Sequence, residues 1–398
     1  MTRRLAGAEM KLKNEVRAEL TGHIIPFWKN LRDDENGGYY GYVAFDLTVD
    51  KKYDKGCILN SRILWFFANA YLTLKDTSLL LEADHAYQFL KEACLDRENG
   101  GIYWSMTYDG QVSDPTKHTY NQAFAIYALS TYYEASKSEE ALETAFSLFH
   151  RIETTCKDEY GYLESFTRDW RPESNEKLSE NGLLADKTMN TLLHVLEAYT
   201  ELYRVSRVKE VEIALKSILT QFKTRVYNEK ERCLEVFFDT GMNTISDLYS
   251  YGHDIEASWL LDRAANLLDG SDIARETKAY TTEIAERIYD AALVNGSLNN
   301  ECFRGKVDTT RVWWVQAEAM VGFYNCYEKT REEKYKGCTE QIWNYIKNHF
   351  IDKREGSEWF WDLSAEGKPV SGKPIVEPWK CPYHNGRMCM EMIRRIAE

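Results

Sequence analysis

The sequence predicts an all-α protein folded as an (α/α)6 barrel of about twelve helices, with short β-strands and long loops at one end. The first observation is repetition: acidic turns, most of them containing glycine, recur about every 60 to 70 residues, a period typical of repeated structural units. The second is that amphipathic and almost wholly apolar helical segments alternate between these turns. Apolar helices in such a number need cover on every side, which favours a closed double ring over an open helical solenoid.

Each repeated turn is expected to be followed by a short strand, and a pair of helices lies between successive turns. The turns lie at 34–40, 96–104, 158–162, 228–234, 294–298 and 352–359. We expect outer, amphipathic helices at 15–31, 79–94, 139–155, 208–225, 273–293 and 332–350, the first kinked or broken at Pro26. The expected inner, apolar helices lie at 61–74, 120–135, 189–203, 253–268, 312–327 and 385–396. Residues 1–12 are expected to be a frayed or disordered end, and residues 13–398 a single catalytic domain.

Composition narrows the possible partners and the compartment. A net charge of −13 argues against nucleic acid and anionic membranes as partners. The 9 cysteines are scattered without paired spacing, which suits free, mostly buried thiols in a reducing cytoplasm. No apolar run reaches the roughly 20 residues that a membrane-spanning helix needs. The 26 tyrosines and 11 tryptophans either fill seams between helices or offer flat faces to sugar rings.

Polar and ionisable residues interrupt the apolar inner helices at their starts, where a closed ring would bring them together around one funnel. Burying such groups is costly unless they are paired or used, so six matching interruptions indicate a site. They are Asn60 and Arg62; His118, Tyr120, Asn121 and Gln122; Asn190 and His194; His253 and Glu256; Arg311, Trp313, Trp314, Gln316 and Glu318; and Trp379, His384 and Arg387.

Several of these residues also have a purely structural interpretation. Asn121, Gln122 and Gln316 are expected to bridge neighbouring helices, and His118 to lie in a loop that is exposed. Glu318 could simply neutralise a buried cation such as Arg311. His253 and Glu256 are three residues apart, so one helical face would carry both, and the carboxylate could orient the imidazole.

Three histidines on separate inner helices leave several chemistries open. They could bind a metal ion, but metal-binding bundles repeat Glu-x-x-His motifs that are not seen here. A glycosidase would need two carboxylates flanking the scissile bond, for which Glu256 and Glu318 are the candidates. No phosphate-binding glycine motif is present, so no nucleotide-dependent route is indicated. Imidazoles with an arginine suit proton abstraction beside the carbonyl of an opened sugar, because histidine can act as acid or base near neutral pH.

The chain resembles the N-acylglucosamine 2-epimerase superfamily over nearly its full length, and within it the branch that acts on cellobiose. The residues that carry the resemblance lie at 59–62, 118–122, 187–194, 251–256, 313–318, 379–380 and 383–385. The resemblance implies an (α/α)6 barrel that converts the reducing-end glucose of cellobiose, lactose or another β-1,4-linked oligosaccharide to mannose, through ring opening and a cis-enediolate. We expect no cofactor, because an opened reducing sugar supplies its own carbonyl for enediolate formation, and no metal.

The resemblance also implies roles for the residues. His253 and His384 would be the acid–base pair, with Glu256 supporting His253, and Arg62 and His194 would contact the opened sugar near O1 and O2. Substrate-binding positions would be Tyr120, Asn190, Trp313, Trp314, Glu318 and Trp379. A soluble, cytoplasmic monomer is expected. The alternatives are a monosaccharide epimerase or mannose isomerase of the same superfamily, an (α/α)6 glycosidase, and a non-catalytic sugar-binding barrel.

Overall fold

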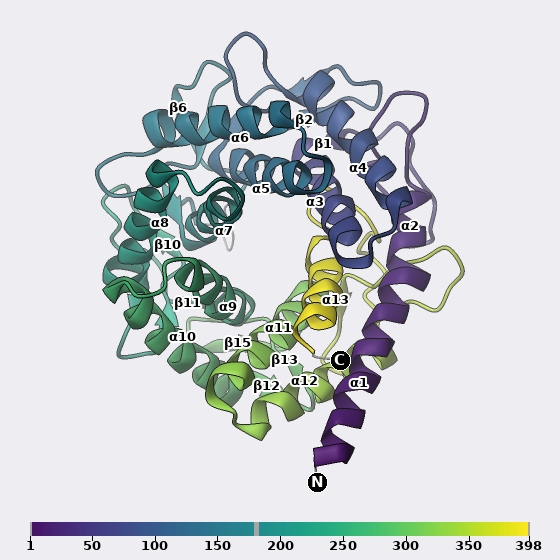
Figure 1. Cartoon of the computed structure of the whole chain (residues 1–398), viewed down its shortest axis with the longest axis vertical. Helices are drawn as coiled ribbons and strands as arrows, with labels where there is room; N and C mark the ends of the chain where they lie inside the picture. Colours follow the sequence, from purple (N-terminus) through teal and green to yellow (C-terminus); the bar gives the residue numbers. More distant parts are fainter. Residues whose placement is uncertain (1, 179–182, 397–398) are drawn as a thin grey trace.

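A computed structural model describes residues 2–178 and 183–396 of the chain, with the side chains of residues 2–6 excepted. Six inner helices follow one another around a ring (Figure 1). They are α3 (Cys57–Leu74), α5 (Thr119–Ser136), α7 (Met189–Ser206), α9 (Tyr251–Leu267), α11 (Trp313–Thr330) and α13 (Tyr383–Arg395). Each packs on the next, and α13 packs on α3, so the ring is closed. The predicted (α/α)6 barrel is confirmed.

The outer helices cover this ring with one apolar face each. They are α1 (Thr2–Glu19) with α2 (Ile25–Lys29), α4 (Thr77–Phe89), α6 (Glu139–Arg151), α8 (Lys209–Gln221), α10 (Asp272–Ala291) and α12 (Glu333–Tyr345). In α6 the buried residues Ala141, Ala145, Leu148 and Phe149 fall at helical spacing on one side. By contrast, every residue of α3 from Cys57 to Ala70 is buried. The expected alternation of half-buried and fully buried helices is therefore present.

Short π-helical segments recur where outer helices turn toward the strands. They are η1 (Leu20–Ile24), η2 (Leu90–Cys94), η3 (Ile152–Cys156), η4 (Phe222–Val226) and η5 (Ile346–Phe350). π-Helical turns often mark functional sites. Here they follow five of the six outer helices at matching places, α10 being the exception, which makes them part of the repeated architecture.

The first helix differs from the expectation. Helix α1 begins at Thr2 and so includes residues 2–12, for which we expected a frayed end. Leu12, Val16 and Leu20 are buried at intervals of four residues, and α1 packs against α13. The expected break near Pro26 is present: η1 separates α1 from α2, and Pro26 lies in the first turn of α2, where its missing N–H is tolerated.

Short strands gather at the end of the ring where the inner helices begin. They are β1 (Lys55–Gly56), β2 (Ser105–Met106), β3 (Val112–Asp114), β4 (Lys117–His118), β5 (Ser165–Phe166), β6 (Pro172–Glu173), β7 (Lys187–Thr188), β8 (Tyr227–Asn228), β9 (Cys233–Leu234), β10 (Phe237–Phe238), β11 (Leu248–Ser250), β12 (Leu293–Val294), β13 (Ser297–Leu298), β14 (Glu301–Phe303), β15 (Lys306–Asp308), β16 (Arg311–Val312) and β17 (Asp362–Leu363). They pair antiparallel, as β1-β2-β3, β4-β5-β6, β10-β7, β11-β14-β15, β16-β17, β8-β9 and β12-β13. Five inner helices follow directly from such a strand.

Buried ion pairs attach the acidic turns to these strands. Lys55, just before α3, binds Asp33 at 2.6 Å, and Lys117, just before α5, binds Asp96 at 3.0 Å. Lys187 binds Asp158 at 2.6 Å before α7, in a pair whose carboxylate is partly exposed. The repeated acidic turns of the sequence thus hold the start of an inner helix in place, which fixes the direction of the side chains on its first turns.

Amide side chains on the first turns of inner helices have a structural role, but they bind backbone groups beside the short strands and do not bridge neighbouring helices as we expected. Gln122 pairs with both backbone groups of Ile102, at 2.7 and 2.9 Å, and Gln316 pairs likewise with Leu298, at 2.8 and 2.9 Å. His118 was predicted wrongly as part of an exposed loop. It is buried, and its Nδ1 accepts a hydrogen bond from the Tyr120 backbone at the start of α5.

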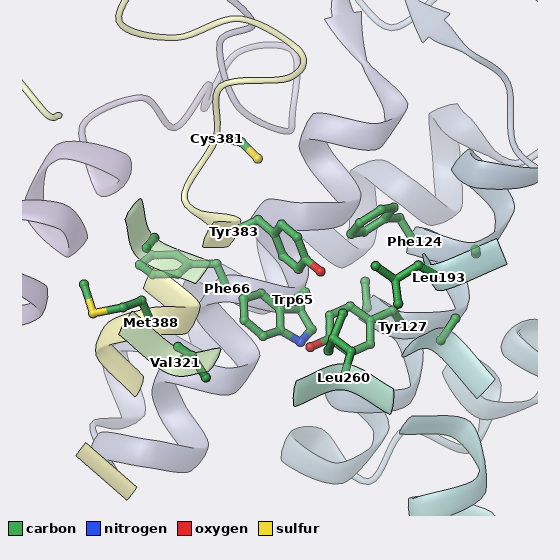
Figure 2. Packing of buried hydrophobic residues seen from close by; sticks show 14 of the residues in the cluster. Trp65, Phe66, Phe124, Tyr127, Leu193, Leu260, Val321, Cys381, Tyr383 and Met388 are labelled. Carbon is green, nitrogen blue, oxygen red and sulfur yellow. The ribbon is translucent and has the colours of Figure 1, made fainter. Parts of the chain in front are cut away.

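Aromatic side chains from different inner helices meet inside the ring (Figure 2). Trp65 of α3 stacks on Tyr127 of α5 with ring centroids 5.2 Å apart, and Tyr383 of α13 meets Trp65 edge-on at 5.4 Å. One hydrophobic cluster contains buried residues from Leu12 to Ile396. The interior of the ring is therefore filled with packed side chains.

The cysteines and the helices agree with two expectations drawn from composition. All nine cysteines are free, and all except Cys302 are buried. Among the described residues, no helix has the length and apolar character that crossing a membrane requires.

Candidate active site

A cavity of about 530 Å3 opens where the inner helices begin. It brings together ten of the eleven residues that the sequence singled out for catalysis or substrate binding. They are Arg62, Tyr120, Asn190, His194, His253, Glu256, Trp313, Trp314, Trp379 and His384. The eleventh, Glu318, does not line the cavity but hydrogen bonds to His384 beneath it.

The three cavity histidines are held in a common way, each through Nδ1. His194 pairs with Glu197 at 2.9 Å, His384 with Glu318 at 2.7 Å, and His253 with the Ser250 hydroxyl at 2.7 Å. Within the described residues, none of their Nε2 atoms makes a hydrogen bond. A carboxylate partner keeps the proton on Nδ1 and leaves Nε2 as a proton acceptor, whereas a hydroxyl can either donate or accept.

Burial favours the neutral form of all three rings. It lowers the pKa of His253 to about 3, and the nearby His194 adds to this effect. Burial also lowers the pKa of His384 well below its usual value, and the positive charge of Arg387 lowers it further. The pKa of His194 is lowered by burial despite its hydrogen bond to Glu197. At neutral pH the cavity therefore presents uncharged imidazoles, which can accept a proton.

The resemblance implied that Glu256 supports His253, but Glu256 makes its contacts with other residues. Its Oε1 binds Nη2 of Arg387 at 2.5 Å and lies 3.9 Å from Nδ1 of His384. The His-x-x-Glu spacing occurs three times in the chain, beginning at His150, His194 and His253. Only His194 forms the hydrogen bond that the spacing allows, to Glu197. The reason is electrostatic, because the buried guanidinium of Arg387 attracts the Glu256 carboxylate away from the imidazole on its own helix.

Arg387 is the centre of a buried charge cluster under the cavity. Its guanidinium contacts the carboxyl groups of Glu197, Glu256 and Glu318, as well as the hydroxyl of Tyr383. Glu256, Glu318 and His384 offer ligand atoms within 4.8 Å of one another, which is a spacing that a metal ion could use. Arg387 already supplies a positive charge to both of these carboxyl groups, although one oxygen of Glu256 and the Nε of Arg387 have no hydrogen-bond partner in the part of the chain that the structure describes.

Three carboxyl groups share this single arginine, and they differ in proton affinity. Burial and then the charge of Glu318 raise the pKa of Glu256 well above its usual value, and one of its oxygens has no partner. Burial also raises the pKa of Glu318, against the opposing effect of Arg387. Glu197 behaves differently: although burial acts against its charge, Arg387 and His194 lower its pKa. The cluster therefore favours a bound proton on its Glu256 and Glu318 side.

Arg62 is buried without a carboxylate partner in the described part of the chain. Its Nη2 donates to the Tyr120 hydroxyl at 2.8 Å, and its guanidinium lies 4.1 Å from the centroid of the Phe124 ring. Its Nε has no hydrogen-bond acceptor. A buried cation held by aromatic faces is well placed to stabilise a negative charge that forms in the cavity.

Aromatic rings form the other walls. Trp314 packs against both His253, at a centroid distance of 4.8 Å, and His384, at 5.4 Å. Trp313 is buried with its indole nitrogen unpaired, and Asn190 carries an unpaired side-chain oxygen. These groups can pair with ligand hydroxyls, while the rings can cover the C–H faces of a sugar.

Sequence reasoning missed part of this site. Glu197 and Ser250, which position two histidines, were not proposed, and Arg387 was noted without a role. The cavity lining has further polar and aromatic residues, namely Lys177, Asn300, Trp361 and Lys373 from loops and Asp362 from strand β17. The i, i+3 spacing of Glu197 from His194 was the available signal for one of them. The loop residues had no sequence signal that could have identified them.

Neutral imidazoles, a buried cation and uncovered aromatic faces in one cavity of an (α/α)6 barrel define a class of enzyme that moves protons on a carbohydrate. Comparison with known proteins makes this specific. The N-acylglucosamine 2-epimerase (GlcNAc 2-epimerase) profile matches residues 37–385. The chain is 54% identical over 382 residues to a cellobiose 2-epimerase of Ruminococcus albus, covering 96% of this chain and 98% of the relative.

Solved structures agree with this result. A sugar epimerase from a ruminal bacterium superposes with a TM-score of 0.96 at 53% identity, covering 97% of this chain and 100% of its own. The cellobiose 2-epimerase of Bacillus thermoamylovorans gives 0.94 at 48% identity, with coverage of 97% and 99%. The chain belongs to the N-acylglucosamine 2-epimerase family, and it is an enzyme of the carbohydrate epimerase class.

Proposed function

We propose that the protein epimerises the reducing-end glucose of cellobiose, and of lactose and other β-1,4-linked oligosaccharides, to mannose at C2. One observation carries this proposal: His253 and His384 come from different inner helices, flank Trp314 in one cavity, and leave Nε2 free. Two such groups can act on opposite faces of one carbon. The similarity to cellobiose 2-epimerases supports the choice of substrate.

The reaction starts with ring opening, in which O1 loses a proton, O5 gains one and the C1–O5 bond breaks to give an aldehyde. Nε2 of His384 then removes the proton from C2, since the Glu318 carboxylate stabilises the imidazolium that forms. The electron pair moves into a C1–C2 double bond, and the carbonyl oxygen becomes an oxyanion. Arg62 and His194 stabilise this cis-enediolate.

Reprotonation occurs from the opposite side. The Ser250 hydroxyl can donate to Nδ1 of His253, which leaves a proton on Nε2 for transfer to C2. The carbonyl forms again and the ring closes. A proton relayed through solvent from the His384 imidazolium to the deprotonated His253 ring then restores both neutral histidines. In the reverse direction the two histidines exchange roles. Tyr120, Asn190, Trp313, Trp314 and Trp379 hold the sugar during these steps.

A glycosidase is not supported by the geometry. Glu256 and Glu318 both bind the same nitrogen of Arg387, and Glu318 lies outside the cavity, so the two carboxyl groups do not flank a space for a scissile bond. We further propose that the reaction needs no cofactor or metal ion and that the chain works as one catalytic domain, as a cytoplasmic monomer.

The test is NMR of cellobiose incubated with the protein in heavy water, after treatment with a chelator and without added cofactor. We expect 4-O-β-glucosylmannose with deuterium at C2, because the enediolate exchanges its proton with a solvent-linked base. Mannose and N-acetylmannosamine assayed in parallel distinguish the monosaccharide-specific alternatives. Release of free glucose, or turnover of a monosaccharide alone, would contradict the proposal.

A further inference from the structure

A second cavity, of about 510 Å3, lies beside the catalytic cavity. Its lining includes Tyr53, Asp54, Trp104, Ser105 and Pro378. This lining combines aromatic rings with carboxylate and hydroxyl groups, a combination that suits an uncharged polyhydroxyl ligand. None of these residues takes part in the reaction described above.

The two cavities meet at a pair of tryptophans. Trp379 lines the catalytic cavity and Trp104 lines the second one, and their rings lie edge to face with centroids 5.9 Å apart. Pro378, next to Trp379 in the chain, lines the second cavity. A chain of sugar units that leaves the catalytic cavity across Trp379 would therefore reach Trp104 next.

The second cavity is built on fixed backbone and has an accessible aromatic ring. The Trp104 carbonyl accepts the backbone N–H of Cys57 at 3.0 Å, which ties it to the start of α3. Tyr53 stacks on Tyr42 at a centroid distance of 4.7 Å and remains 38% exposed. One face of Tyr53 is thus supported by the protein, and the exposed remainder of the side chain is available to a ligand.

We propose that this cavity is a distal subsite that binds the third glycosyl unit of a β-1,4-linked oligosaccharide whose reducing end lies at His253 and His384. This rests on the proposed function, since it requires the reducing end to react in the catalytic cavity. Each cavity has a volume within the range of small-ligand pockets, so a disaccharide occupies the first and longer chains extend into the second.

The test compares kcat/KM for cellotriose and cellobiose in the wild type and in Tyr53→Ala and Asp54→Asn variants. We expect wild type to prefer cellotriose, and each variant to reduce the ratio of the two kcat/KM values by about three- to tenfold, as loss of one such contact predicts. Tyr160→Ala, which removes another exposed tyrosine that lines neither cavity, is the control and should leave the ratio unchanged.

The outcomes separate this inference from the proposed function. If cellobiose and cellotriose are both epimerised but neither variant changes the ratio, the distal subsite is wrong and the proposed function stands. A wild-type ratio at or below one also overturns the subsite. If neither sugar is epimerised, the proposed function itself fails. Two substitutions at separate side chains keep the test decisive if one variant does not fold.

Discussion

The two ends of the inner ring both contain buried charge, but they arrange it differently. Where the helices begin, three carboxyl groups share Arg387. Where they end, five basic groups pair with five acidic groups among the described residues. These are Arg204, Arg263, Lys329, Arg394 and Arg395 with Glu134, Glu201, Asp262, Glu328 and Glu391.

The difference shows which charges hold the barrel together and which are available for chemistry. A cavity of about 360 Å3 also opens at the far end, so a cavity alone does not identify a site. There, Glu391 is charged: although burial opposes this, Arg395 and Arg263 lower its pKa to about 2. At the end where the helices begin, Glu256 keeps an unpaired oxygen and Arg62 an unpaired N–H. Among the described residues, incomplete pairing of buried charged groups therefore distinguishes the end that holds the histidine cavity.

The largest expected effect follows from removing either free imidazole. His253→Ala and His384→Ala should each lower kcat/KM for cellobiose by at least about a thousandfold, because general acid or base catalysis is lost. The far-end variant Glu391→Gln should stay within about threefold of wild type. Kinetics with cellobiose and a thermal unfolding curve for each variant provide the measurement. Near-normal activity in either histidine variant would remove that residue from the proposed pair.

Stability should distinguish the two arginines that lie in these networks. Arg387→Met leaves three buried carboxyl groups without their cation and should destabilise the fold by about 3–5 kcal/mol. Arg263→Met should cost less, since its side chain is 26% exposed and neighbouring arginines still face Glu201 and Glu391. Thermal unfolding midpoints of both variants give the comparison. Equal losses would mean that the two networks do not differ in the way described.

The sequence predicted the barrel well because the signals for it are local. The expected helix 61–74 lies within α3 (Cys57–Leu74), and its continuous apolar character alone indicated burial. The polar residues at inner helix starts also identified the cavity, because a closed ring forces those starts together. Fold and site location therefore follow from periodicity and closure.

The pairing inside the site could not be predicted, because it depends on groups far apart in the chain. Glu256 and Arg387 are separated by 131 positions, and their contact decides where Glu256 points. Ser250 is the last residue of strand β11, directly before α9, and its role depends on how the strand joins the helix. Which of several acids binds a buried base is set by the assembled ring.

Acid sensitivity offers a finer comparison of the two ends. The pKa of His253 is lowered to about 3 by burial, so the unfolded chain binds a proton there below about pH 6.5 while the folded protein does not. This contribution to stability is present above pH 6.5 and is lost as the pH falls. The free energy of unfolding of the wild type should therefore fall more between pH 7 and pH 5 than that of His253→Asn.

The matched far-end variant should behave differently over the same interval. Glu391 has a pKa lowered to about 2, so it is ionised in both folded and unfolded chains between pH 7 and pH 5. The gap between wild type and Glu391→Gln should stay constant there and shrink only at lower pH. Unfolding free energies at pH 7, 6 and 5 check both statements, and parallel behaviour of the two variants would contradict them.

The smallest expected effect concerns Ser250, which holds His253 without touching the carbon that reacts. Ser250→Ala should lower kcat by about tenfold, because the imidazole loses the hydrogen bond that orients it and keeps a proton on Nε2. KM should change little, and Ser250→Thr should restore most of the rate. The residue positions a proton donor, so the pH dependence of kcat should also shift. A variant that loses stability while its kcat and pH profile stay normal would assign Ser250 to the structural network and leave His253 to be positioned by Trp314 alone.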